Sequence, residues 1–312
     1  GSEMCIRDST RIVQWDKEDC ADLGIIKIDL LGLGMLAALE ETLPLIERHE
    51  GRALDLAHLP PDDPDTYAML CKADTVGVFQ IESRAQMAML PRLKPRNYYD
   101  LVIEISLVRP GPITGGMVHP YLKRRNGEEP TIYPHPCLEP VLRKTLGVPL
   151  FQEQVMQIAQ IMGGYSLGEA DLLRRAMGKK KQKEMDKQRV RFLAGAQENG
   201  VDEKTASAVF ELMAEFAKYG FNKSHTAAYG FIAYQTAWIK NHLPAEFFAA
   251  LLTIESSNTD KVLLYMDDAR RHDIKVLPPD VNESQLKFTV VGDKVRFGLA
   301  AVKGVGSSAI EA

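Results

Sequence analysis

A nearly unbroken series of helical patterns occupies the second half of the chain and restricts the fold to a mainly helical class. Apolar residues recur there at helical spacing, and glycine, proline or polar capping residues separate one segment from the next. Ser166 and Glu169 have the spacing of a capping box, which predicts where one of these helices begins. The predicted helices are 152–162, 166–177, 181–199, 203–217, 224–241, 245–255 and 260–271.

The first half and the last forty residues are less regular. We expect a helix over 33–49 that Pro44 kinks or shortens, a connector at 54–65, and helical segments at 66–73 and 98–108. Residues 77–81 are expected to be extended, and 287–291 with 294–297 to form a hairpin around Gly292 and Asp293. The predicted fold class is therefore mainly α with small β elements, an α+β arrangement.

Composition limits the class of protein further. A chain of 312 residues with 45% hydrophobic and 26% charged residues is expected to form two or three structural units. The longest apolar stretch, 226–239, contains Gly230 and Gln235 and is too short to span a bilayer, so no membrane segment is expected. Residues 1–9 carry no apolar signal region and fit poorly with the residues after them, which favours an expression or sequencing remnant.

The cysteines indicate a reducing compartment. Cys5, Cys20, Cys71 and Cys137 show no paired spacing, which is typical of free thiols in the cytoplasm. His119 and His135 lie near Cys137, but a fourth ligand at a familiar spacing is missing, so a zinc site is not expected.

Two charged residues, Lys27 and Asp29, interrupt the apolar run 24–32. This run of isoleucine and leucine predicts a strand, on which positions i and i+2 face the same side. Unpaired buried charge is costly, so either the two residues form an ion pair or their face borders an open cleft. Spacing alone favours the ion pair.

A strongly basic segment lies on this acidic chain, whose formal net charge is −4. Residues 174–191 contain two acidic residues, Glu184 and Asp186, and nine basic ones. The basic residues are Arg174, Arg175, Lys179, Lys180, Lys181, Lys183, Lys187, Arg189 and Arg191. Such asymmetry indicates a directed anion-binding face, while the alternative is a solvated helix face.

Two loops accompany the basic segment. In 109–116 two prolines stiffen the backbone and three glycines let it approach a ligand, although a plain surface turn is equally consistent. In 219–225 the chain enters a helix at Lys223, Ser224 and His225, which predicts a phosphate cradle beside Tyr219 and Phe221 as base-stacking rings. Taken alone, Ser224 would serve as an N-cap.

Other familiar nucleotide motifs are absent from the sequence. Neither a Gly-x-x-x-x-Gly-Lys-Ser/Thr loop nor a Gly-x-Gly-x-x-Gly turn occurs, which argues against a P-loop ATPase and a dinucleotide-binding fold. We also find no Gly-x-Ser-x-Gly and no hydrolase triad. Near the end, Lys303, Gly304 and Gly306 form a Gly-x-Gly turn whose backbone suits a DNA phosphate, as in helix-hairpin-helix elements, or is an ordinary turn.

Seven segments, in this order, resemble the catalytic alpha subunit of bacterial DNA polymerase III, the C-family polymerases. Together they cover the chain from about residue 11 to its end. The segments are 27–33, 78–84, 109–112, 151–156, 174–181, 219–225 and 277–280.

The resemblance implies a template-directed DNA polymerase that transfers deoxynucleotides from dNTPs to a primer 3′-hydroxyl in DNA replication. It implies that Asp29 is one of three palm carboxylates that bind two Mg²⁺ ions and that Lys27 contacts phosphate. Implied nucleotide contacts are Arg174, Arg175, Lys179, Lys180, Tyr219, Asn222, Lys223, Ser224 and His225, with Arg84, Arg109 and Gly111 along the same cleft. Implied DNA contacts are Lys181, Lys303, Gly304 and Gly306.

The resemblance also implies a division of the chain and a set of partners. Residues 10–34 would be the C-terminal end of the palm, 35–273 the fingers, and 274–312 a small β hairpin with the start of a helix-hairpin-helix-like element. The other two metal-binding aspartates are not found in 1–28, so we expect a fragment that is inactive alone. Partners of the full-length parent would be primer-template DNA, dNTP, the sliding clamp, a proofreading exonuclease and clamp-loader subunits, with no membrane.

Two alternatives remain open from the sequence. Segments 83–96 and 119–125 look like the error-prone translesion paralogue, whereas 177–181 and 221–225 look replicative, which we favour. The second alternative is a non-catalytic nucleic-acid-binding module on the same scaffold, which would bind DNA with strong salt dependence and show no preference for a nucleoside triphosphate.

Overall fold

The computed structural model describes residues 3–5, 11–13, 15–26, 28, 34–108, 114–178, 182–217, 220–306 and 310. Its α-helices are α1 (Lys17–Asp22), α2 (Gly34–Glu50), α3 (Pro64–Cys71), α4 (Arg84–Leu93), α5 (Tyr98–Leu107), α6 (Thr114–Arg125), α7 (Glu139–Leu142), α8 (Gln152–Gly163), α9 (Leu167–Gly178), α10 (Gln182–Glu198), α11 (Glu203–Ala217), α12 (Lys223–His242), α13 (Pro244–Ile254) and α14 (Thr259–Arg271). Its strands are β1 (Glu3–Cys5), β2 (Arg11–Val13), β3 (Lys275–Leu277), β4 (Thr289–Val291) and β5 (Lys294–Arg296). Short 3-10 helices are η1 (Leu56–His58), η2 (Pro136–Leu138), η3 (Arg143–Thr145) and η4 (Leu299–Ala301).

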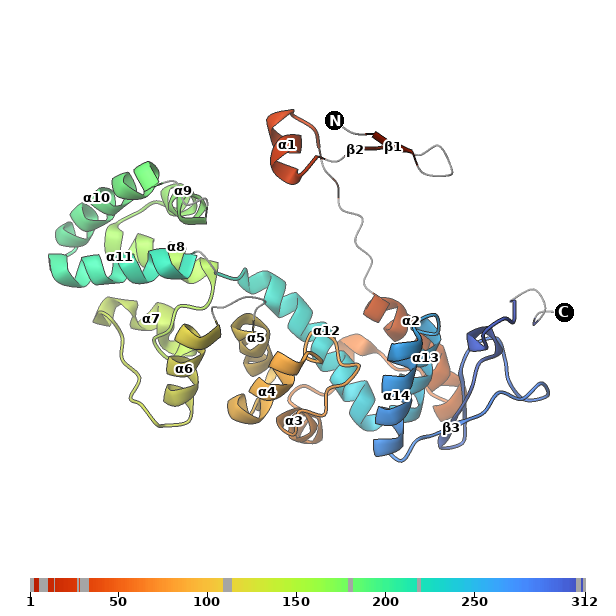
Figure 1. Ribbon diagram of the computed structural model, residues 1–312. Coiled ribbons are helices and arrows are strands. Elements are labelled where there is room, and N and C mark those ends of the chain that lie inside the picture. Colours follow the sequence, from red (N-terminus) through yellow and green to blue (C-terminus); the bar gives the residue numbers. More distant parts are fainter. Residues whose placement is uncertain are drawn as a thin grey trace.

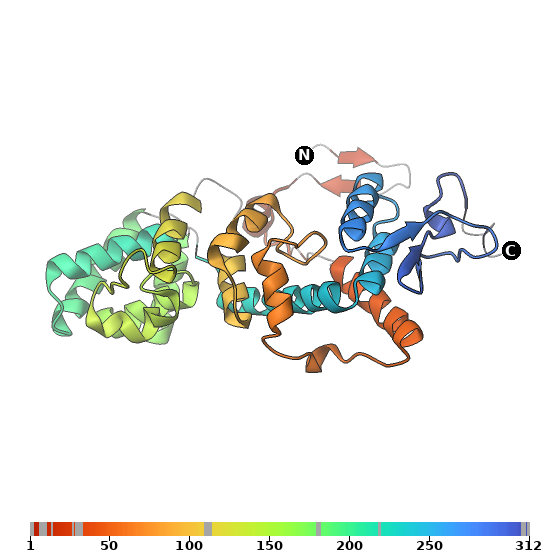
Figure 2. The ribbon, with the colours of Figure 1, turned by 90° about the horizontal axis from the view of Figure 1, so that it is seen from below.

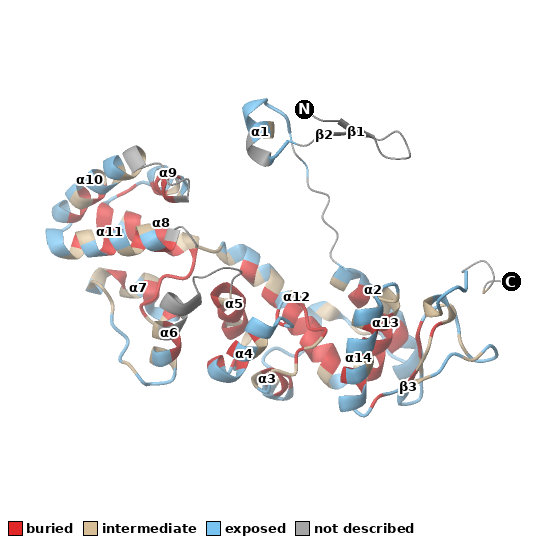
Figure 3. Ribbon diagram, in the orientation of Figure 1, coloured by how far each residue is buried: buried red, intermediate tan, exposed pale blue. Residues whose placement is uncertain are grey.

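The described residues form three hydrophobic clusters along an elongated molecule (Figure 1). The largest combines α2, α3, α12, α13 and α14 with the β3–β5 sheet. A second lies within α8 to α11, and a third joins α4, α5 and α6 to the segment 148–151. Figure 3 shows buried residues concentrated in α5, α12 and α13. The prediction of a mainly helical fold with small β elements is confirmed.

Helix α12 connects two of these clusters. Its 20 residues span roughly 30 Å, since an α-helix rises about 1.5 Å per residue. Ala227 packs against the third cluster, while Ala233, Ala237 and Ile239 are wholly buried in the first. Figure 2 shows α12 running lengthwise between the two ends of the molecule. Side chains at its two ends are therefore held at opposite sides of a common body.

Helix α2 confirms its predicted range, but Pro44 does not end it. The proline lies inside the helix, and the next two residues, Leu45 and Ile46, are buried against the first cluster. Burying two such side chains stabilises by about 1.5–3 kcal/mol each, which offsets the roughly 3 kcal/mol that an internal proline costs. Tertiary packing therefore outweighs the local signal.

The predicted helices from 152 onwards are confirmed, whereas α4 and α6 were missed. In α4 the residues Gln86, Met89, Leu90 and Leu93 are buried at i, i+3, i+4 and i+7, and Ser83 caps the first turn by accepting from the Gln86 N–H at 3.3 Å. This helical spacing of buried residues is present in the sequence, but the helix was not predicted because Pro91 lies in its last turn. Helix α6 begins at Thr114, within the segment expected to be a turn-rich loop.

Two extended segments were predicted wrongly. Residues 77–81 form turns, because the Thr75 hydroxyl donates to the Ile81 carbonyl at 2.7 Å and Gln80 has a φ of 64°. Ile26 and Ile28 belong to no strand and are 85% and 75% exposed, so they do not pack behind Lys27 and Asp29. Of the predicted strand 24–32, the described residues 24–26 and 28 pair with no strand, and the other positions lie outside the described residues. Lys27 and Asp29 themselves lie outside the described residues.

The C-terminal β region combines a predicted hairpin with an unpredicted strand. β4 and β5 are antiparallel with Val290 opposite Val295, which confirms the hairpin around Gly292 and Asp293. β3 joins β5 in parallel, with Val276 opposite Val295, and gives the order β3-β5-β4. Val295 is wholly buried, so its strand anchors the sheet to the first cluster.

A buried ion-pair network fixes the C-terminal end of α12. The Lys240 ammonium is fully buried and donates to Asp268 at 2.7 Å, to Asp74 at 2.8 Å and to the Val76 carbonyl at 3.0 Å. His272 Nε2 lies 3.1 Å from Asp74 Oδ1. Burial raises the pKa of Asp74, but bonds to His272 and Lys240 outweigh it and lower the pKa to about 2. Three distant segments are thereby joined at one cation.

Candidate nucleotide-binding site

The beginning of α8 holds the loop that leads into α12. Phe151 and Phe221 form a parallel β-bridge, and the Gln152 backbone N–H donates to the Phe221 carbonyl at 2.9 Å. The Gln152 side chain adds a bond from Nε2 to the Gly220 carbonyl at 2.8 Å. Two of the segments singled out by sequence therefore meet in space, although almost seventy residues separate them.

The Gln154 side chain also stabilises the start of α8. Its Oε1 accepts from the Leu150 and Phe151 N–H groups at 2.7 and 3.0 Å, and its Nε2 donates to Thr145 Oγ1 at 2.8 Å. The sequence indicated 151–156 through its resemblance alone and gave these residues no role. The structure shows that consecutive polar side chains in this segment bind backbone groups of neighbouring loops.

The N-terminal turn of α12 is capped by side chains of the chain itself. Both oxygens of the Glu153 carboxylate accept from the Lys223 N–H at 3.1 Å. Asn222 is the N-cap, and its Oδ1 accepts from the His225 N–H at 2.9 Å. Ser224 is therefore not the cap, and its hydroxyl donates to the same Asn222 oxygen.

This capping determines what a phosphate would meet. The backbone N–H groups of Lys223 and His225 already have acceptors, so a phosphate at this end of α12 would contact side chains in place of these two amides. Ser224 and His225 are exposed at the turn, and Lys223 is half-buried. Asn222, two positions before the predicted helix start at residue 224, was the sequence signal for the cap.

Arg174 and Arg175 of α9 lie beside this loop. Arg174 Nη1 donates to Gln152 Oε1 at 3.3 Å, and the same glutamine binds Gly220, so a single side chain connects Arg174 to the entry of α12. Asp171 accepts from Arg174 at 2.8 Å and from Arg175 at 2.8 Å. The hydrogen bond from Arg174 lowers the pKa of Asp171. Arg175 is 64% exposed and open to a ligand.

Aromatic rings extend from this loop along α12. The ring centroids of Phe221 and His225 lie 5.4 Å apart, those of His225 and Tyr229 4.1 Å, and those of Tyr229 and Phe79 5.1 Å. The Lys223 ammonium lies 5.5 Å from the centre of the Tyr99 ring and 5.7 Å from that of Phe151. An exposed histidine at the head of a ring series is a suitable stacking surface for a base.

The structure thus brings together Arg174, Arg175, Asn222, Lys223, Ser224 and His225, which we call the basic site. Predicted residues that lie outside the described part of the chain are Lys27, Asp29, Arg109, Gly111, Lys179, Lys180, Lys181 and Tyr219.

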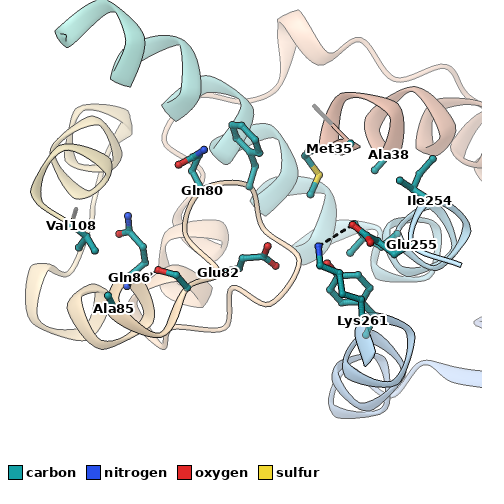
Figure 4. A pocket seen from close by; sticks show the side chains of 15 residues that line it. Met35, Ala38, Gln80, Glu82, Ala85, Gln86, Val108, Ile254, Glu255 and Lys261 are labelled. Carbon is teal, nitrogen blue, oxygen red and sulfur yellow. Dashed lines mark hydrogen bonds and ion pairs between the residues drawn. The ribbon is translucent and has the colours of Figure 1, made fainter. Parts of the chain in front are cut away.

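Arg84 lies elsewhere, beside a separate cleft of about 610 Å³ between α2, the 79–86 segment, α13 and α14 (Figure 4). No described contact connects Arg84 to the basic site. Gln86 lines this cleft with its buried Oε1, which has no hydrogen-bond partner among the described residues. At the other wall Lys261 donates to Glu255 at 2.9 Å. Val108 also lines the cleft.

The predicted DNA contacts near the C-terminus lie on an exposed turn. Lys303, Gly304 and Gly306 follow η4, and the Val305 N–H donates to the Val302 carbonyl at 3.2 Å. Gly304 has a φ of 88°, where a side chain is disfavoured, and nothing lies within 4 Å of a Cβ added there or at Gly306. The backbone is therefore accessible to a phosphate.

The described residues offer no fitting metal site at the basic site. Glu153 and Asp171 are the carboxylates there, and they are engaged with the Lys223 N–H and with the two arginines. The cluster of Asp74, Asp268 and His272 surrounds the Lys240 ammonium, which already supplies the cation. A further group, His49 with Glu50 and Glu246, lies on α2 and α13, away from the basic site.

Fold and site together define a helical protein with basic side chains gathered at the entry of α12. None of the helices described is long and apolar enough to cross a membrane. Residues 35–200 match the family described as the bacterial DNA polymerase III alpha subunit finger domain, and the chain belongs to this family. Residues 273–312 match the helix-hairpin-helix motif.

Relatives agree with this assignment over nearly the whole chain. The chain is 49% identical to the error-prone DNA polymerase of Corynebacterium glutamicum over 99% of its own length and 30% of the relative. For the error-prone DNA polymerase of Mycobacterium tuberculosis the identity is 50% over 96% of this chain and 28% of the relative. For DNA polymerase III subunit alpha of Pseudomonas aeruginosa it is 46% over 96% of this chain and 26% of the relative. The predicted resemblance is confirmed, and the chain spans between a quarter and a third of these relatives.

Proposed function

We propose that this chain is the fingers part of a template-directed DNA polymerase and that the basic site binds the triphosphate of an incoming deoxynucleotide. The observation that carries the proposal is the Gln152 side chain, which binds both Arg174 and the Gly220 carbonyl. It sets a guanidinium beside the α12 turn that bears Lys223 and His225. Phosphoryl transfer needs positioned cations for the developing charge on the phosphates, and arginine forks suit that role.

The proposal extends to residues outside the described part of the chain. Lys179 and Lys180 directly follow α9 and would add positive charge next to Arg175. By resemblance, Asp29 would hold Mg²⁺ with two carboxylates from elsewhere in the parent, and Lys27 would contact phosphate. Since the described residues offer no fitting metal site at the basic site, we derive no step through a metal ion.

We further propose the domain division 10–34 as palm, 35–273 as fingers and 274–312 as a DNA-binding element. The helix-hairpin-helix match over 273–312 and the open turn at Gly304 support duplex contacts through Lys303, Gly304 and Gly306. A cytoplasmic location, with a sliding clamp, exonuclease and clamp loader as partners of the parent, belongs to the same proposal. The identities of 49% and 46% to error-prone and replicative relatives differ too little to assign the subtype.

Kinetics of the full-length polymerase test the basic site. Arg175→Ala should raise the KM for dNTP about tenfold, or lower kcat by a similar factor, because a charge-assisted hydrogen bond to phosphate contributes about 1.5–3 kcal/mol. Arg189→Ala is the matched control, since this exposed arginine pairs with Glu211 at 3.1 Å on α11. If Arg175→Ala changes only the affinity for DNA, these residues belong to the template-primer surface.

The metal assignment has its own test. This chain alone should show no primer extension with Mg²⁺, and the full-length polymerase should lose activity on Asp29→Asn. Unchanged activity in that variant would contradict the role of Asp29. DNA binding with steep salt dependence but without nucleotide discrimination would favour the non-catalytic module instead.

A further inference from the structure

A second, larger groove runs between the 56–62 connector and the middle of α12. Its volume is about 980 Å³, which is ample for several side chains of a peptide. Its walls include Leu56 and Leu59 from the connector, Tyr67 from α3, Tyr98 from α5, and Phe231 and Ile232 from α12. No residue of the basic site lines it. The nucleotide-binding proposal therefore does not account for this groove.

Among the described residues, the groove contains a buried hydroxyl without a hydrogen-bond partner. Tyr98 donates to the Ala227 carbonyl, and Tyr234 donates to the Pro60 carbonyl and accepts from the Asp63 N–H at 3.1 Å. Tyr67 also lines the groove and is only 4% exposed, yet its hydroxyl has no hydrogen-bond partner among the described residues. Buried polar groups are normally satisfied, so this donor indicates a missing acceptor.

The protonation state of Tyr67 supports a donor role. Burial, with a contribution from Asp62, raises the pKa of the Tyr67 hydroxyl far above its ordinary value, so the group keeps its proton at any physiological pH. The acceptor that completes it must be a neutral or anionic oxygen, and a peptide carbonyl meets this requirement.

An exposed aromatic ring lies along the same groove. Phe231 is 45% exposed although it belongs to a helix whose following residues are largely buried. Exposed phenyl rings beside a concave apolar wall are typical of surfaces that receive an apolar anchor residue from a partner.

Asp62 is the acidic residue among those that line the groove, and none of its lining residues is lysine or arginine. Residues 53–71 contain Asp55, Asp62, Asp63 and Asp65 but neither lysine nor arginine, and 226–239 of α12 carry no charged residue. His58 pairs with Asp55 at 2.6 Å, and His242 pairs with Asp63 at 2.9 Å, whereas Asp62 and Asp65 are exposed. This charge repels nucleic acid and favours a cationic ligand.

We propose that this groove docks a basic amphipathic peptide segment of a partner protein. An apolar side chain packs against Phe231 and Leu59, a backbone carbonyl accepts from the Tyr67 hydroxyl, and a lysine or arginine side chain pairs with Asp62. The three features are independent of one another: an apolar wall, an unsatisfied donor and an acidic lining residue.

Peptide selection on this 312-residue chain tests the proposal. A phage-displayed library of random twelve-residue peptides is panned on the chain, and an enriched peptide is labelled for fluorescence anisotropy. We expect enriched sequences to combine an aromatic or aliphatic anchor with two or more basic residues. Phe231→Ser should weaken binding about tenfold or more, and Tyr67→Phe about three- to tenfold. Asp62→Asn, which keeps the oxygen that accepts from the Tyr98 N–H at 3.1 Å, should flatten the salt dependence.

Matched variants distinguish docking from misfolding. Leu263→Ser removes another exposed apolar residue, 60% exposed on α14, and should leave the affinity unchanged. Tyr67→Phe deletes only an unpartnered hydroxyl, so the thermal stability should stay equal or rise. Failure to enrich any sequence, enrichment of acidic peptides, or binding that survives Phe231→Ser would overturn the proposal. Displacement of the peptide by duplex DNA, or by the remaining part of the parent polymerase added in trans, would also overturn it.

Discussion

The basic site and the groove lined by Asp62 and Phe231 both involve helix α12. They differ in how far their polar groups are hydrogen-bonded within the chain. At the N-terminal turn of α12 the polar side chains of Gln152, Glu153 and Asn222 are bonded within the chain, while Arg175, Ser224 and His225 are exposed. Beside the middle of α12 the buried hydroxyl of Tyr67, on α3, has no hydrogen-bond partner among the described residues, and the Phe231 ring on α12 is exposed. A surface that is rigid before binding suits a small charged ligand, whereas an incomplete one indicates a ligand that supplies its own backbone groups.

Removing the anchor of α12 should have the largest effect on both regions. Lys240→Met leaves the buried Asp268 and the half-buried Asp74 without their cation, and breaking a buried pair costs about 3–5 kcal/mol. Urea unfolding of the chain measures this loss. Arg271→Met on α14 is the control, because its exposed pair with Asp267 should contribute less than about 1 kcal/mol. Equal losses for the two variants would contradict the anchoring role of Lys240.

Removing the cap should loosen the basic site alone. Asn222→Ala leaves the His225 N–H without its side-chain acceptor and should cost about 1 kcal/mol in the free energy of unfolding. Ser224→Ala should cost less than about 0.5 kcal/mol, since Ser224 is exposed and is not the cap. Chemical denaturation of both variants decides the order. A larger loss for Ser224→Ala would show that the serine caps the helix after all.

Lowering the pH should weaken the ion pair between Asp74 and Lys240, which holds the C-terminal end of α12. The folded pKa of Asp74 is about 2, below its ordinary value of 3.8, so its contribution is present above about pH 4 and is lost as the pH falls towards 2. Because Asp74 is partly exposed, screening limits this contribution to about 1 kcal/mol. The difference in unfolding free energy between the native chain and Asp74→Asn should therefore shrink between pH 6 and pH 3. A difference independent of pH would contradict the assigned shift.

The smallest effect is expected in the groove. Phe231→Ser removes an exposed ring and should change the free energy of unfolding by less than about 0.5 kcal/mol, even though it abolishes peptide docking. Thermal unfolding without peptide measures this. A loss of several degrees in Tm would mean that Phe231 is part of the fold and would weaken the contrast between the two regions.

Local signals predicted the elements where they agreed with tertiary packing. The helices from α8 to α14 follow from apolar period and caps, and the bonds between Ser166 and Glu169 confirm the predicted capping box. Predictions were wrong where packing decides. Pro44 stays inside α2, α4 runs through Pro91, and residues 77–81 turn because Thr75 binds the Ile81 carbonyl.

The candidate site was predicted by residue type and only partly by geometry. Arg174, Arg175 and the 222–225 turn do come together, as the sequence suggested, but the residues that join them were given no role. Gln152 and Gly220 are 68 positions apart, and no local pattern connects them. Arg84, assigned to the same cleft by resemblance, lies beside the hollow between α2, α13 and α14, and Phe79, which lines that hollow, also ends the ring series that starts at the basic site.

The sequence by itself determined the class of fold, the family and the basic character of the segment after Leu173, because helical period, capping and charge are local properties. Tertiary structure alone decided that Lys240 is a buried cation, since its partners Asp74 and Asp268 lie 166 and 28 residues away. It also decided that the amides of the α12 turn are engaged by Glu153 and Asn222 and that Tyr67 lacks a partner among the described residues. Hydrogen bonding and burial depend on which distant groups meet, and only the packed chain brings those groups together.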